Sequence, residues 1–194
     1  MTTSATGGYL PPLSNPVVLD DAGLSDFFHD WIVGLTGFPG ANVRPRWQEE
    51  PGNIPTDPSL NWVAFGVAVG DRDVYAAELH HDESGGYNEL RRHEKLTLKC
   101  SFYGPGARGN AGLMIDAAAV GQNREALTLN SMGLIEWGSI ISFPELIRQK
   151  WYNRADTSIQ IRRQIVRRFG VLPVNTVGID LDNEHYITHI RTAS

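Results

Sequence analysis

Histidines and a short acidic run are the residues of this 194-residue chain whose types could hold a metal ion or carry a proton. His80 and His81 are adjacent in a predicted strand, where successive side chains point to opposite faces, so they cannot easily share one ion. His185 and His189 have the spacing of a helical zinc pair. The aromatic and β-branched residues between them favour a strand, and no HExxH motif is present. We therefore expect no metal site.

The nucleophile elbow of hydrolases and the phosphate loop of NTPases are absent as well. No GxSxG elbow occurs, and no GxxxxGK[ST] loop is present. Pro105 lies just before a predicted helix and removes one of the N–H groups that a phosphate loop would use. The carboxylates are scattered, mostly in predicted turns, and no feature selects a catalytic pair. The sequence predicts no catalytic residue and no cofactor, and we do not expect an enzyme.

Basic clusters are the strongest polar feature of a chain whose formal net charge is -5. The two clusters are Arg162, Arg163, Arg167 and Arg168, with Arg148, Lys150 and Arg154 upstream, and Arg91, Arg92, Lys95 and Lys99. They could be solvated strand faces, nucleic-acid contacts, or partners for acidic turns on another copy of the chain. We favour the third interpretation because Arg163 and Arg167 interrupt an apolar strand face, where a buried arginine needs a carboxylate partner.

Two tryptophans lie beside basic residues and could anchor an interface, since Trp and Arg are enriched at such anchors. Trp47 ends the run Arg-Pro-Arg-Trp, and Trp151 follows a basic stretch. Core packing explains either tryptophan equally well. The candidate subunit-interface residues are Arg44, Arg46, Trp47, Arg91, Arg92, Trp151, Arg163 and Arg167.

Composition places the chain among ordinary globular proteins, with 41% hydrophobic and 20% charged residues. Its single cysteine, Cys100, excludes an intrachain disulfide framework and suits a reducing compartment. We find neither a signal peptide nor a long apolar run, so we expect a soluble protein, made in the cytoplasm, with no membrane segment.

The elements that must position these residues follow from periodicity and from prolines. Residues 1–20 read as an extended arm, and residues 21–194 as a single domain that opens with a helix over 22–35. Strands are expected at 62–69 and 74–80, joined by a turn as partners, and a long strand over 88–103 breaks at Gly104-Pro105. Its Leu96, Leu98, Cys100 and Phe102 share one face.

A helix then begins at Pro105, with a second near 123–129. Extended segments follow at 132–142, 157–169, 174–181 and 185–191, and Pro144 is expected to open a short turn. Strands and helices come in runs rather than in alternation. The fold class is therefore α+β, with a mostly antiparallel sheet packed against two or three helices.

Three stretches resemble the phage neck or tail terminator proteins, which cap the tail tube at the head–tail junction. They are RRHEKLTLKCSFYGPGA, GLTGFPGANVRPRWQEEPGNIP with NWVAFGV, and PELIRQKWYNRADTSIQIRRQIVRRFGV. Together they cover most of the chain beyond its first twenty residues. The resemblance implies a tail-terminator-like fold in a structural virion protein that forms a homohexameric ring, ends tail-tube polymerisation and gives the head connector a docking face.

The same resemblance implies the partners. These would be further copies of the chain, the tail tube protein and a head completion or connector protein. DNA would pass through the ring without sequence-specific binding, and no membrane is involved. The protein would reside in the virion neck and, during assembly, in the host cytoplasm. Two alternatives stay open: an adaptor that joins the portal to the tail, and a small hydrolase whose site the sequence does not reveal.

Overall fold

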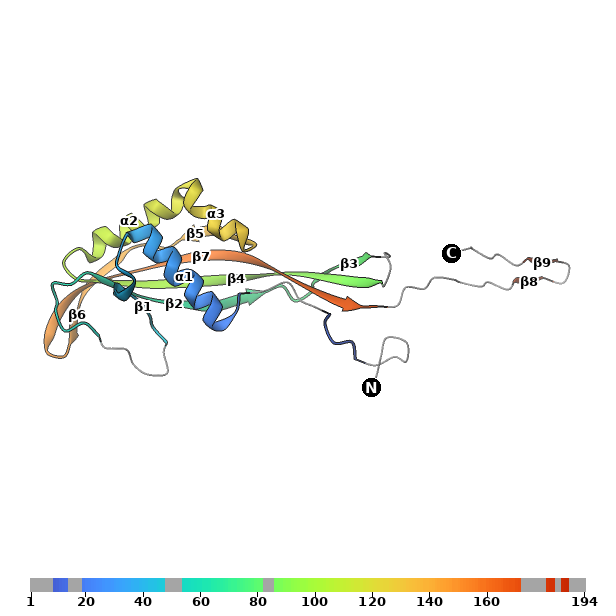
Figure 1. The fold of residues 1–194 in the computed structure, drawn as a ribbon, viewed down its shortest axis with the longest axis horizontal. Helices are drawn as coiled ribbons and strands as arrows, with labels where there is room; N and C mark the ends of the chain where they lie inside the picture. The colour runs from blue at the N-terminus through green and yellow to red at the C-terminus, as the bar shows by residue number, and fades with distance from the viewer. Residues whose placement is uncertain are drawn as a thin grey trace. The chain divides into compact units, whose positions relative to one another are not determined.

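The computed structural model describes residues 9–13, 19–47, 54–81 and 86–171, and the backbone of 181–183 and 186–188. These residues contain a seven-stranded, mostly antiparallel sheet and three α-helices (Figure 1), which confirms the predicted α+β class. The chain divides into two compact units. Unit 1 comprises Met1–Pro16, Ala77–Arg91 and Val166–Ser194, and unit 2 comprises Val17–Ala76 and Arg92–Ile165. A single domain behind an arm of residues 1–20 stays a prediction.

Unit 2 contains most of the regular structure. Its elements are α1 (Asp21–Thr36), the 3-10 helix η1 (Gly40–Asn42), β1 (Val43–Pro45), β2 (Trp62–Arg72), α2 (Ala107–Ala119), α3 (Gly121–Leu129), β5 (Met132–Trp137) and β6 (Ile141–Ile147). Strand β3 (Ala77–His81) belongs to unit 1, and the long strands β4 (Tyr87–Tyr103) and β7 (Lys150–Gly170) contribute to both units. Strands β8 (Leu181–Asn183) and β9 (Tyr186–Thr188) pair with each other.

The sheet has the strand order β1-β2-β4-β7-β5, with β3 beside β4 and β6 beside β7. Strand β1 is parallel to β2, whereas the β2–β4, β3–β4, β5–β7 and β6–β7 pairs are antiparallel. The prediction that residues 74–80 pair with β2 is wrong. Strand β4 is long enough for two partners, so β2 takes the part from Glu94 onward and β3 takes Tyr87–Arg91.

Two further predictions need correction. Pro144 lies inside β6 rather than in a turn, because β6 is an edge strand in which a missing N–H costs little. The segment predicted to be extended over 132–142 is two strands, β5 and β6, that follow one another along the same partner, β7. The predicted strand 174–181 and most of the arm 1–20 lie outside the described residues.

One face of the sheet carries the main core of unit 2. The predicted apolar face of β4 is buried, from Leu96 to Phe102 at alternate positions, and it packs with α1, α2 and β7. Figure 1 shows the helices on this side of the sheet. Cys100 is 1% exposed, and burial raises the pKa of its thiol to about 12. The thiol is therefore a small core side chain rather than a reactive group.

The other face of β4 is only partly covered. Tyr103 stacks on Trp62 with ring centroids 4.2 Å apart, and Tyr152 completes this small second cluster. Because side chains alternate along a strand, Lys99 and Ser101 lie on this same face. We call it the open face of the sheet. It carries the polar groups described below.

The turn between β4 and α2 depends on Gly104, which has a φ of 104°. A Cβ at this position would lie 2.5 Å from the carbonyl oxygen of Leu60. Helix α2 starts at Ala107 rather than at Pro105, and Pro105 belongs to the turn. Gly104, Gly106 and Gly109 have the spacing of a GxGxxG loop, but here Gly106 N–H donates to the Asn61 side chain and Ala107 N–H to Gly104 O. The turn is a structural one.

Replacing Gly104 with Ala is expected to destabilise the protein by about 2 kcal/mol or more, because it adds a left-handed backbone penalty to a clash with Leu60. Gly109→Ala is the matched control, since no atom lies within 4 Å of a Cβ there, and it should stabilise α2 by about 0.5 kcal/mol. Urea unfolding of both variants measures the difference. Equal stability of the two would contradict this account of the turn.

Candidate subunit interface

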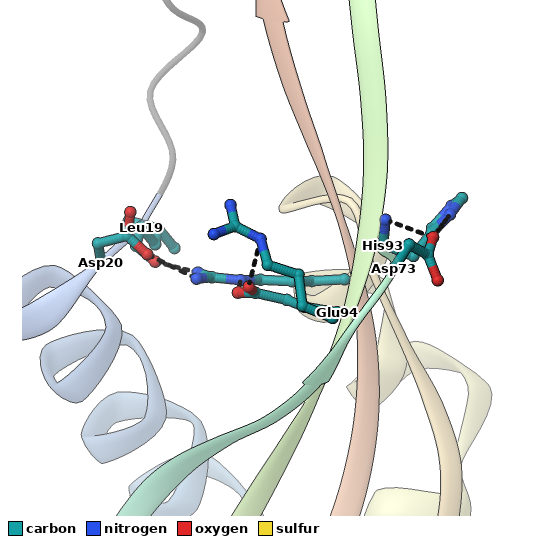
Figure 2. A network of polar contacts seen from close by, with 7 residues as sticks. Leu19, Asp20, Asp73, His93 and Glu94 are labelled. Carbon is teal, nitrogen blue, oxygen red and sulfur yellow. Dashed lines mark hydrogen bonds and ion pairs between the residues drawn. The ribbon is translucent and has the colours of Figure 1, made fainter. Parts of the chain in front are cut away.

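Arg163 lies on the buried face of β7, between Ile161 and Ile165, and it is only 5% exposed. Its Nε donates to Oε1 of Glu94, a β4 residue that is itself 4% exposed. Its Nη1 donates to the carbonyl of Leu19, and its Nη2 lies 2.5 Å from Oδ1 of Asp20 at the start of α1. Figure 2 shows Glu94 facing Asp20 and Leu19 across this contact.

The predicted carboxylate partner of Arg163 therefore exists, but it comes from the same chain and not from a neighbouring copy. The reason is that β4 and β7 are neighbours in the sheet, and Glu94 and Arg163 are both buried there. A second arginine, Arg72 of β2, lies 3.7 Å from the other oxygen of Glu94. Arg163 holds unit 2 together, so reversing its charge would test folding rather than assembly.

A separate contact lies beside this group on β4. Oδ2 of Asp73 accepts a hydrogen bond of 2.9 Å from the backbone N–H of His93 and lies 3.4 Å from its Nδ1 (Figure 2). The backbone hydrogen bond of His93 lowers the pKa of the Asp73 carboxyl. This pair fixes the end of β2 against β4 and leaves both side chains partly exposed.

Replacing Arg163 with Met is expected to destabilise the protein by about 3 kcal/mol, because the buried Glu94 then keeps only Arg72, a partly exposed arginine 3.7 Å away, as its counter-charge. Adding Glu94→Met should recover most of that loss, since it removes the unpaired carboxylate. Arg162→Met, at the exposed neighbouring position, should change the free energy of unfolding by about 0.5 kcal/mol or less. Chemical denaturation checks all three. The assignment fails if Arg163→Met is as stable as Arg162→Met.

The open face carries a second polar network, built on Asp156 of β7. Arg154 donates to both oxygens of Asp156, at 2.8 Å each, and its Nη1 lies 3.1 Å from Oε2 of Glu145. Ser101 Oγ donates to Asp156 and accepts from Nη2 of Arg46. Arg46, a predicted interface residue, is thus tied into its own chain and is half-buried.

The charge state of this network follows from its contacts. Burial alone would raise the pKa of the Asp156 carboxyl, but hydrogen bonds from Arg154 and Ser101 outweigh it and lower the pKa. A cavity of about 410 Å³ adjoins the network and is lined by Arg46, Lys99, Gly138 and Thr157, among others. Asp156 and Arg46, which both line the cavity, are already paired within the chain, so the network braces the open face.

Because the pKa of Asp156 is lower in the folded protein, its stabilising effect is present above the unfolded value of about 3.9. That effect is lost as pH falls through the folded value. We expect Asp156→Asn to be less stable than the wild type at neutral pH, and the gap between them to close below about pH 4. Thermal unfolding across pH measures the gap. A gap that is constant with pH would contradict an ionised Asp156.

Arg91 belongs to a third cluster, in unit 1, around the buried carboxylate of Glu89. Nε of Arg91 lies 2.7 Å from one oxygen of Glu89, and Nε of Arg168 lies 3.1 Å from the other. The hydrogen bond from Arg91 lowers the pKa of Glu89. The Arg168 guanidinium also lies over the Tyr87 ring, 5.2 Å from its centroid. Arg91 is thus paired within its chain and about half exposed.

The other candidates lie nearer the solvent. Trp47 and Trp151 are 65% and 67% exposed, so in this chain neither is a core residue. Nε of Arg44 donates to the carbonyl of Ala41. Arg92 and Arg167 are partly exposed and form no ion pair with any residue that the structure describes. The structure does not gather the eight candidates at one site, and their role as interface residues stays a prediction.

The carboxylates that pair with these arginines were not identified from the sequence. Glu94 could have been found, because it continues the alternation of Leu96 and Leu98 into the buried face. Arg154 and Asp156 are two residues apart on one strand and so share a face, which could have paired them. Asp20 carries no such signal, since its partner comes from a distant strand. In the described parts of the chain, no group of three or more His, Cys, Asp or Glu could hold a metal ion. Likewise, none of the helices described there is long and apolar enough to cross a membrane.

Comparison with known proteins identifies the family of this chain. A search of curated proteins found no match to the chain. A family model described as phage neck terminator protein matches residues 22–187, which is most of the sequence and includes β1 to β7, α2, α3 and nearly all of α1. The match agrees with the predicted resemblance and identifies a structural component of the virion neck. The chain belongs to the phage neck terminator protein family.

Proposed function

We propose that six copies of this protein form a closed ring on the last layer of the phage tail tube. The ring ends polymerisation of the tube and gives the head connector a surface on which to dock. The observation that carries this proposal is the family match over residues 22–187. The partners are further copies of the chain, the tail tube protein and a head completion or connector protein.

The mechanism is geometric. An interface between two different surfaces of the same chain closes into a ring when its rotation allows, and otherwise gives a filament. A ring with one face complementary to the tube and another that is not would stop growth after one layer. DNA passes through such a ring without sequence-specific contacts. Assembly takes place in the host cytoplasm, and the finished ring stays in the virion neck.

The distribution of charge supports a rigid building block. Three arginines pair with carboxylates of their own chain: Arg163, Arg154 and Arg91. These charges therefore need no partner protein for the chain to fold. Trp47 and Trp151, by contrast, expose most of their surface in the single chain. Large exposed aromatic residues are typical anchors of protein interfaces. Of the eight interface candidates, Trp47 and Trp151 are therefore the first to expect at the contact of the proposed ring.

Native mass spectrometry of the purified protein, alone and with tail tubes, tests the proposal. We expect a closed six-subunit species, at least in the presence of tubes, and tubes that stop growing once it binds. Trp151→Ser should weaken the ring without unfolding the chain, because this side chain is 67% exposed. Arg108→Glu, on the exposed side of α2, is the control that should assemble normally. A protein that neither assembles nor binds tube ends would contradict the proposed function.

A further inference from the structure

Unit 2 has a groove between the N-terminal part of α1 and the outer edge of β2. Its volume is about 520 Å³, and Leu24, Trp47, Phe65, Val67 and Val69 supply its apolar lining. Strand β1 pairs with β2 only at Val63–Phe65. From Gly66 onward, no strand among the described residues covers this edge of β2. The groove therefore offers apolar surface and uncovered backbone on one side of the sheet.

The rim of the groove is acidic. Asp21 and Asp26 line it from α1, and both are exposed. Helix α1 contains no Lys or Arg, and its one histidine, His29, pairs with Asp30. Asp20 is different, because its charge is already paired with Arg163. The groove consequently fits a partner that is apolar and positively charged.

The hairpin formed by β6 and the start of β7, residues 141–151, has those properties. Ile141, Leu146 and Trp151 are 61%, 56% and 67% exposed. Glu145 lies 3.1 Å from Arg154, which it shares with Asp156, and the basic residues near the tip are Arg148 and Lys150. Nζ of Lys150 donates to the carbonyl of Thr56. In Figure 1 the hairpin lies at the end of unit 2, beyond the helices.

The tip itself is unusual. Ile147 pairs with Lys150, so Arg148 and Gln149 form a two-residue turn, and their φ values are 47° and 65°. Turns of this kind favour Asn and Gly, because other side chains strain the left-handed backbone. Arg148 nevertheless occupies this position, is exposed, and forms no ion pair with any described residue. The turn therefore exposes a positive charge that has no counter-charge in the described part of the chain.

From these observations we infer that the β6–β7 hairpin of one copy docks in the α1–β2 groove of the next copy, with Arg148 facing Asp26. The inference rests on the proposed function, since it supplies the contact of the ring. A second copy is the occupant that fits best, because both complementary surfaces belong to one chain. They lie on different elements, so the contact is heterologous and can close into a ring. Pro144 lacks an N–H, which keeps the β6 edge from extending into an open-ended ladder.

A charge swap tests this contact. Arg148→Glu and Asp26→Lys should each weaken self-association about tenfold or more, because each places like charges together. The double variant Arg148→Glu with Asp26→Lys restores opposite charges and should recover wild-type assembly. Arg108→Glu and Asp116→Lys on α2 make the same charge changes at exposed positions outside both surfaces and should have little effect. Native mass spectrometry, alone and on tail tubes, gives the readout, and circular dichroism confirms folding.

The outcomes separate this inference from the proposed function. If the wild type assembles and the single variants assemble equally well, the hairpin and groove are not the contact, although the ring stands. Single variants that form rings but no longer bind tubes would reassign these surfaces to the tube protein and overturn the inference. The inference would also be overturned if the double variant, like the single variants, failed to assemble. A wild type that never assembles contradicts the proposed function itself.

Discussion

The buried ion pair between Arg163 and Glu94 is the constraint on which unit 2 depends. Two charges held in an apolar interior must be paired and hydrogen-bonded, because an unpaired buried charge lowers the free energy of unfolding by several kcal/mol. Here the pair joins neighbouring strands β4 and β7, and Asp20 and Leu19 bring the start of α1 to the same arginine. One side chain thus fixes the position of the first helix relative to the two longest strands.

The same rule accounts for the open face. Asp156, a partly buried carboxylate, accepts hydrogen bonds from Arg154 and Ser101, and Arg46 in turn donates to Ser101. The surface carries exposed tryptophans, an acidic helix and a basic hairpin tip. A protein that pairs its interior charges within one chain but exposes large aromatic residues has a surface suited to binding other proteins.

The strand order then determines which edges of the sheet can contact another protein. A sheet has two edges, and here β2 with its short neighbour β1 forms one, while β5 and β6 form the other. One irregularity in β5 and Pro144 in β6 interrupt the second edge, and the carboxylates of α1 lie beside the first. Edges protected in different ways favour contact between unlike surfaces, which is the geometry that a ring requires.

Local patterns in the sequence determined the parts of this protein that depend on local physics. The alternation from Leu96 to Phe102 and the three- and four-residue spacing in α1 specify which faces are buried, because each follows from backbone geometry. The need of Arg163 for a carboxylate was also visible. Which carboxylate it meets, which strand pairs with β3, and whether Pro144 sits in a turn or at an edge were decided only by the tertiary structure. Each depends on strands distant in sequence, and no local signal encodes their register.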